Sequence, residues 1–156
     1  MKNISFYSVL VIFLLLSTVS SCDSDNNSSS SQPVVDVTPI VNAMMQGTWR
    51  VTFYEDHTQN ETDHFTGYNF TFGSGNVLTA TNGTITNTGT WSVTNNISND
   101  DSPDDKVDFN IYFASPPFFE DITDDWDIIS RTATKIELVD VSGGSENTDY
   151  LTFEKN

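Results

Sequence analysis

The stretch VDFNIYF, residues 107–113, alternates apolar and polar side chains without interruption. Its apolar positions are Val107, Phe109, Ile111 and Phe113. Successive side chains of a β-strand point to opposite faces, so this pattern predicts a strand with one buried face. The chain beyond Gly47 shows no sustained helical period, and we therefore expect an all-β domain.

Shorter runs with the same period of two lie on either side of this stretch. They are WRVTFY (49–54), YNFTF (68–72), NVLTAT (76–81), TGTWSVT (88–94), WDIISR (126–131), KIELVDV (135–141) and DYLTFEK (149–155). Glycine-rich turns such as GSGN (73–76) separate some of them, which is typical of hairpins. Before the first run, PIVNAMM (39–45) predicts a short helix with proline in its first turn.

Eight short strands joined by tight turns predict an up-and-down antiparallel barrel, with a β-sandwich as the alternative. The succession of hairpins and the short helix before them favour the barrel. The side chains expected to point inward are Trp49, Val51, Phe53, Tyr68, Phe70, Phe72, Trp91, Val93, Phe109, Ile111 and Phe113. A barrel of this size is either filled by its own side chains or holds one small ligand. These residues are therefore candidates for the lining of a ligand site or for a packed core.

The first residues of the chain predict a secretory signal peptide over 1–21. Lys2 precedes an apolar run over 4–16, and serines close the segment. That run is shorter than the roughly 20 apolar residues that a membrane-spanning helix needs.

The tetrapeptide Val19-Ser20-Ser21-Cys22 resembles the bacterial lipobox, in which the cysteine becomes the first mature residue and is lipidated. The resemblance implies that acyl chains on Cys22 anchor the protein to a membrane. The alternative is an ordinary secretory signal beside a stray cysteine. Residues 22–37 are polar and rich in serine, which predicts a flexible tether after the lipidated cysteine. The barrel domain is then expected over 38–156.

The charge of the chain restricts its partners. Loss of residues 1–21 removes one lysine and no acid, so the net charge falls from −16 to −17. Nucleic acid and anionic lipid headgroups would be repelled and are not expected partners. Asp23 and Asp25, just after the cysteine, resemble sorting signals of bacterial lipoproteins, and we expect the outer membrane, with export to the cell surface or inner-membrane retention as alternatives.

The order of motifs after the tether resembles the lipocalin fold. A short helix runs into Gly47-Thr48-Trp49, which is similar to the Gly-x-Trp start of lipocalins, and YNFTFGSGNVL (68–78), GTWSV (89–93) and YLTFEK (150–155) follow in order. The chain thus resembles the lipocalin-like domains of bacterial lipoproteins. It departs from animal lipocalins because Thr148-Asp149-Tyr150 opens the last strand, where we take the tripeptide as chance. The family's basic residue over the tryptophan corresponds to either Lys155 or Arg131.

The resemblance implies a binding module for a small hydrophobic or amphipathic molecule. The alternative is a closed barrel that docks on another envelope protein through its loops. Phe118 and Phe119 follow two prolines in a connection and are candidates for a docking contact, a ligand gate or a plug at the barrel mouth.

Catalysis, cofactors and metals are not expected. Cys22 is acylated in this interpretation, and no Gly-x-Ser-x-Gly motif occurs. His57 and His64 lie in one loop beside Asp56 and Asp63 without close ligand spacing, so exposed loop histidines are the expectation. The acidic stretches NDDSPDDKVD (99–108) and FEDITDDWD (119–127) lack EF-hand spacing, and weak calcium binding there is a minor alternative.

Overall fold

The computed structural model describes residues 35–95, 107–142 and 148–156, all of which lie in the compact unit Ser31–Asn156. The helices are α1 (Thr38–Met44) and α2 (Pro117–Glu120), with 3₁₀ turns η1 (Thr62–Phe65) and η2 (Ser74–Asn76). The strands are β1 (Trp49–Asp56), β2 (Gln59–Asn60), β3 (Asn69–Phe72), β4 (Val77–Thr81), β5 (Thr86–Asn95), β6 (Val107–Tyr112), β7 (Asp124–Arg131), β8 (Lys135–Val141) and β9 (Thr148–Lys155).

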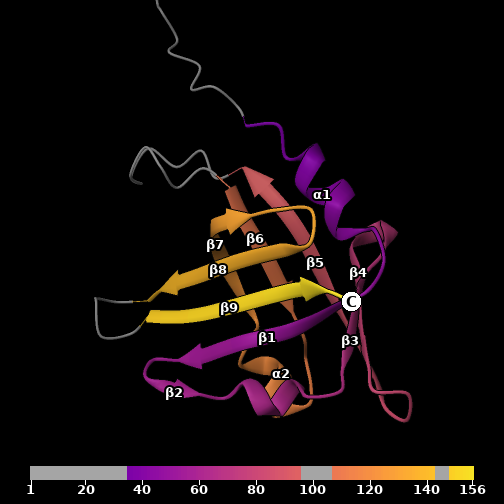
Figure 1. Cartoon of the computed structure of the whole chain (residues 1–156), viewed down its shortest axis with the longest axis vertical. Helices are drawn as coiled ribbons and strands as arrows, with labels where there is room; N and C mark the ends of the chain where they lie inside the picture. Colours follow the sequence, from indigo (N-terminus) through magenta and orange to yellow (C-terminus); the bar gives the residue numbers. More distant parts are fainter. Residues whose placement is uncertain (1–34, 96–106, 143–147) are drawn as a thin grey trace, which may run out of the picture. The chain divides into compact units, whose positions relative to one another are not determined.

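The strands form a closed antiparallel barrel of lipocalin type, which confirms the predicted fold. Each strand from β3 to β8 pairs with the strand that follows it, and β1 closes the ring by pairing with β3 and with β9 (Figure 1). The β1–β9 ladder extends from Trp49↔Lys155 to Glu55↔Tyr150, whereas β1 and β3 pair only at Trp49↔Phe70. The two-residue strand β2, which the sequence pattern did not predict, folds back on the end of β1. Closure leaves few free sheet edges.

The start of β1 fixes α1 against the barrel. The Trp49 indole Nε1 donates a hydrogen bond to the carbonyl oxygen of Met44 over 2.9 Å, and Ile40 and Met44 are buried. Lys155 Nζ lies 5.1 Å from the centre of the Trp49 ring. Lys155, and not Arg131, is therefore the basic residue that covers this tryptophan through a cation–π contact.

Ten of the eleven residues expected to point inward are buried: Trp49, Val51, Tyr68, Phe70, Phe72, Trp91, Val93, Phe109, Ile111 and Phe113. Phe53 is the exception, and its predicted inward position is wrong. The β1–β9 register shifts between Val51 and Phe53, which inserts a β-bulge. The bulge reverses the alternation, so Phe53 is only half-buried and Tyr54 is 1% exposed. Every later position of β1 changes face with it.

Aromatic rings fill the middle of the described interior. The ring of Phe72 lies 5.2 Å from that of Trp91, 5.7 Å from Phe109 and 5.5 Å from Phe153. These pairs are edge-to-face, the arrangement that ring quadrupoles favour. This part of the barrel interior is therefore a packed core.

Among the described residues, no helix is long and apolar enough to span a bilayer.

Candidate functional site

Two connections cover one end of the barrel, the end at which β1 finishes and β7 and β9 begin. The connection from β1 to β3 supplies η1, and the connection from β6 to β7 supplies α2; the two turns lie together below β1 in Figure 1. Phe65 of η1 lies 5.6 Å from Phe119 of α2, measured between ring centres. The Tyr54 hydroxyl donates a hydrogen bond to the carbonyl oxygen of Asp121 over 2.8 Å. We call this end the covered mouth.

Phe119 is the centre of the cover. Its ring centre lies 4.8 Å from Phe113, 5.1 Å from Tyr68 and 5.9 Å from Phe70. The side chain is fully buried, with 0% exposure. An exposed docking role for Phe119 is therefore wrong, because the side chain acts as a plug. Phe118 is half-buried beside it and packs against the core.

Beside the plug, the inward face of the barrel changes from apolar to acidic. Asp124, Asp140, Asp149 and Asp56 lie on β7, β8, β9 and β1, which are neighbours in the sheet. Each is two positions along its strand from a buried side chain, namely Trp126, Leu138, Leu151 and Tyr54. Because residues two apart in a strand share a face, all four carboxylates face the barrel interior at the covered mouth. We call these four residues the acidic rim.

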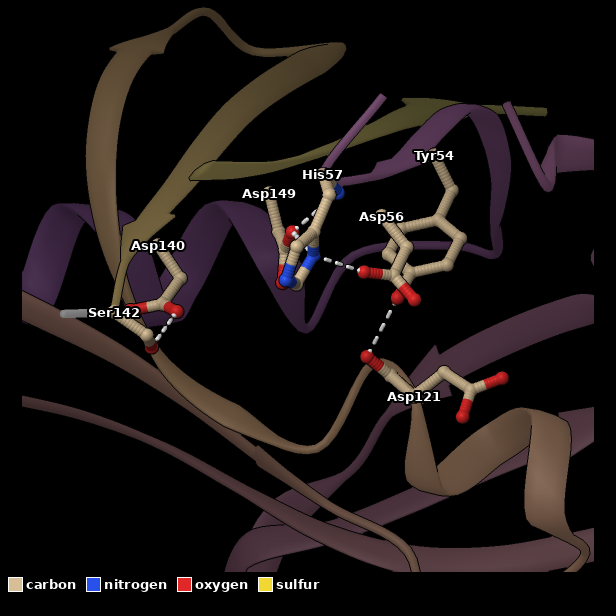
Figure 2. A network of polar contacts seen from close by, with 7 residues as sticks. All are labelled: Tyr54, Asp56, His57, Asp121, Asp140, Ser142 and Asp149. Carbon is tan, nitrogen blue, oxygen red and sulfur yellow. Dashed lines mark hydrogen bonds and ion pairs between the residues drawn. The ribbon is translucent and has the colours of Figure 1, made fainter. Parts of the chain in front are cut away.

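Two members of the acidic rim are direct neighbours across a strand pair. Asp140 and Asp149 are Cα partners in the β8–β9 register. Like charges placed directly opposite are destabilising. Figure 2 shows Asp56, Asp140 and Asp149 around one region of the mouth, with the Asp121 backbone facing them from the α2 connection. The rim therefore concentrates negative charge where the core ends.

Asp124 has the clearest electrostatic consequence. Burial raises the pKa of its carboxyl to about 6, and the charge of Asp140 adds to the shift. The unfolded chain, with an aspartate pKa of about 4, releases this proton more readily than the folded protein. Asp124 therefore leaves stability unaffected below about pH 4 and lowers it as the pH rises towards 6 and beyond.

We expect Asp124→Asn to raise the free energy of unfolding by about 1 kcal/mol near pH 8, allowing for solvent screening of this partly exposed group. Near pH 4 the same substitution should have almost no effect, because Asp124 is then neutral in the folded state. The amide oxygen retains the acceptor for the Asp125 N–H, which lies 2.8 Å away. Urea unfolding at both pH values measures the difference. An equal gain at the two pH values would show that the charge of Asp124 is not its cause.

At the end of β1, His57 lies between two rim carboxylates. Its Nδ1 contacts Oδ1 of Asp56 and lies 3.1 Å from Oδ1 of Asp149 (Figure 2). The His57 backbone N–H donates to the same Asp149 oxygen over 2.7 Å. The hydrogen bond to Asp56 and the charge of Asp149 raise the pKa of His57. Asp149 belongs to the Thr-Asp-Tyr sequence that we took as chance, and the closure of the barrel places it here.

His64 lies in a second group of one histidine and two carboxylates. Its Nδ1 lies 3.5 Å from Oε2 of Glu61, and Asp121 completes a set of potential ligand atoms that lie within 4.8 Å of one another. Both histidines are exposed, as the sequence predicts. The sequence pattern did not reveal their distant partners, Asp149 for His57 and Asp121 for His64, because no local spacing connects them. Pairing of β9 with β1 brings Asp149 close to His57, and the α2 connection brings Asp121 close to His64.

Open pockets lie outside the packed core. One of about 310 Å³ borders Asp124 on the wall of β5, β6 and β7. Another, of about 380 Å³, lies at the weakly paired β1–β3 seam and reaches Phe65 and Tyr68 beneath the cover. The seam pocket therefore borders the same aromatic cluster as the plug.

No family model, curated protein or solved structure matches the chain significantly.

Proposed function

We propose that the protein is a lipid-anchored envelope lipoprotein whose barrel binds a small amphipathic molecule at the covered mouth. The observation that carries this proposal is the change of the inward face, over two residues of each strand, from apolar side chains to the four carboxylates of the acidic rim. Such a boundary suits a molecule with an apolar part and a cationic end, because opposite charge steers and orients the ligand.

The cover provides the means of entry. The elements η1 and α2 are single turns of four residues each, joined to the barrel by connections. Opening of this cover would break the ring contacts of Phe119, so the apolar part of the ligand would have to replace them. Movement of α2 would withdraw Phe119 from between Tyr68 and Phe113 and expose apolar surface next to the rim.

The anchor rests on the lipobox-like sequence before Cys22, which lies outside the described residues. Acyl chains on Cys22 would hold the barrel at a membrane, with the outer membrane as the proposed location. Labelling of growing cells with a radioactive fatty acid tests this part. Incorporation should occur in the intact protein and be absent from Cys22→Ser; equal labelling of both would refute lipidation at Cys22.

Native mass spectrometry tests ligand binding directly. Residues 31–156 contain every described element and the hydrophobic core, so this unit is suitable for isolation from a bacterial periplasm. We expect extra mass that disappears on denaturation, and a reduced bound fraction in the double variant Asp140→Asn, Asp149→Asn. A folded domain that carries no ligand under any gentle condition would contradict the proposal.

The packed interior favours a second candidate, a surface module that docks on another envelope protein. Phe70, Phe72, Phe109 and Phe153 are each at most 1% exposed and occupy the middle of the barrel. A barrel filled in this way needs no ligand to complete its core. If the domain carries no ligand, cross-linking on cells with Phe118→Ser as the matched variant tests docking. Loss of one specific cross-linked partner would support it, and unchanged cross-linking would exclude Phe118 as the contact.

A further inference from the structure

The group formed by Asp56, His57 and Asp149 has the composition of a transition-metal site. It offers one imidazole nitrogen and two carboxylate oxygens, and these atoms all lie within 4.8 Å of one another. Zinc binds nitrogen and carboxylate oxygen at about 2.0–2.2 Å, so two ligands of one tetrahedral ion lie roughly 3.3 Å apart. The separation of 3.1 Å between His57 Nδ1 and Asp149 Oδ1 fits that geometry, whereas the hydrogen-bond contact between His57 Nδ1 and Asp56 would have to lengthen to admit an ion.

Two hydrogen-bonded strands hold Asp56 and Asp149, and His57 begins the turn that follows β1. The β-bulge after Val51 turns Asp56 to the inner face, and the β1–β9 ladder brings the start of β9 beside it. Asp149 is the least exposed ligand, with a side-chain exposure of 17%. Its Oδ1 also accepts the His57 backbone N–H, the kind of outer contact that orients a metal-binding carboxylate. Asp56 and Asp149, which lie on barrel strands, are therefore held more firmly than carboxylates on loops would be.

The identity of the ligands selects the metal. Calcium and magnesium prefer sites made only of oxygen, whereas an imidazole favours zinc and its neighbours in the first transition series. Three protein ligands leave one tetrahedral position for solvent or for another group. The side chain of Asp140, opposite Asp149 in the sheet, adds negative charge that favours a divalent cation.

A comparison within the chain supports this choice. The protein has two histidines, and a ring nitrogen of each lies within 4.8 Å of carboxylate oxygens from two positions, one of them distant in sequence. The His64 group is held less firmly, because Glu61 precedes η1 and Asp121 follows α2, so that neither carboxylate lies on a barrel strand. The His64 group therefore serves as a control with nearly the same chemistry.

We propose that Asp56, His57 Nδ1 and Asp149 bind one divalent transition-metal ion of the zinc class at the covered mouth. The site shares Asp56 and Asp149 with the acidic rim, so a bound ion would occupy part of the surface proposed for the cationic end of the ligand, but it needs no movement of α2.

Calorimetric titration of Zn²⁺ into the metal-free unit 31–156 tests the site. We expect one ion per chain, with the affinity reduced by about 100-fold or more in His57→Ala and in Asp149→Asn, since loss of an outer-shell partner alone costs 10–100-fold. His64→Ala should bind as the unsubstituted protein does, and an equal concentration of Ca²⁺ should not compete. If His57→Ala fails to fold, His57→Gln replaces it, with folding checked by circular dichroism.

Three outcomes would overturn the site: no zinc binding, binding that survives both His57→Ala and Asp149→Asn, or binding abolished by His64→Ala alone. The titration uses zinc without the organic ligand, and native mass spectrometry of the unsubstituted protein detects the organic ligand without added zinc, so failure of the metal site is distinguishable from failure of the proposed function.

Discussion

Replacement of Phe119 by alanine is expected to lower the free energy of unfolding by about 3–5 kcal/mol, the cost of emptying a large aromatic site in a core. Phe119 is fully buried, and its ring contacts those of Phe65, Tyr68, Phe70 and Phe113. The cavity would join η1, α2 and the barrel, three parts that cannot all close on it. Urea unfolding followed by tryptophan fluorescence measures the change.

Phe118→Ala is the matched control, because the two residues are adjacent in α2 and chemically identical. Phe118 is only half-buried, so we expect a loss of about 1–2 kcal/mol. A result in which the two substitutions cost the same, or in which Phe119→Ala costs less than about 1 kcal/mol, would contradict the assignment of Phe119 as the plug.

Trp49→Ala should have a comparable effect, a loss of about 3–5 kcal/mol, at the opposite end of β1. Trp49 is 0% exposed and lies where β1 pairs with both Phe70 of β3 and Lys155 of β9. Its indole N–H also connects the barrel to α1 through the Met44 carbonyl. The substitution removes core volume, a buried hydrogen bond and the cation–π contact at the closing seam.

Trp49→Phe separates these contributions. The smaller ring keeps most of the packing but leaves the Met44 carbonyl without this donor, so we expect a loss of about 1–3 kcal/mol. Equilibrium unfolding in urea, monitored by far-ultraviolet circular dichroism, compares both variants with the parent. Equal losses in the two variants would show that the hydrogen bond, and not packing at the seam, dominates at this position.

The alternation of side chains was sufficient to predict the barrel, because a period of two carries both the strand assignment and the buried face. It was insufficient after Val51, where the bulge adds one residue to β1. The pattern WRVTFYED continues smoothly through residues 49–56, and nothing in it marks the extra residue. Phe53 was consequently placed inside and Tyr54 outside, and Asp56 was assigned to the loop.

The candidate site depended on that same bulge and on barrel closure. Asp56 faces the interior only because the alternation reverses, and Asp149 reaches His57 only because β9 pairs with β1. Asp149 and His57 are 92 positions apart in sequence, so no local motif could connect them. The acidic rim could have been found once the strands were aligned, since Asp124, Asp140 and Asp149 each continue the inward series of their own strand.

The most direct test of the central claim is a nuclear magnetic resonance titration of the unit 31–156 with two amphiphiles of equal tail length and opposite charge. Octyltrimethylammonium and octyl sulfate, both kept below their micelle-forming concentrations, are suitable probes. We predict that the cationic amphiphile shifts the amide signals of Asp56, Asp124, Asp140, Asp149 and the α2 residues, and that the anionic one does so at least about tenfold more weakly. Equal shifts by both amphiphiles, or shifts confined to surfaces away from the covered mouth, would contradict amphiphile binding at this end of the barrel.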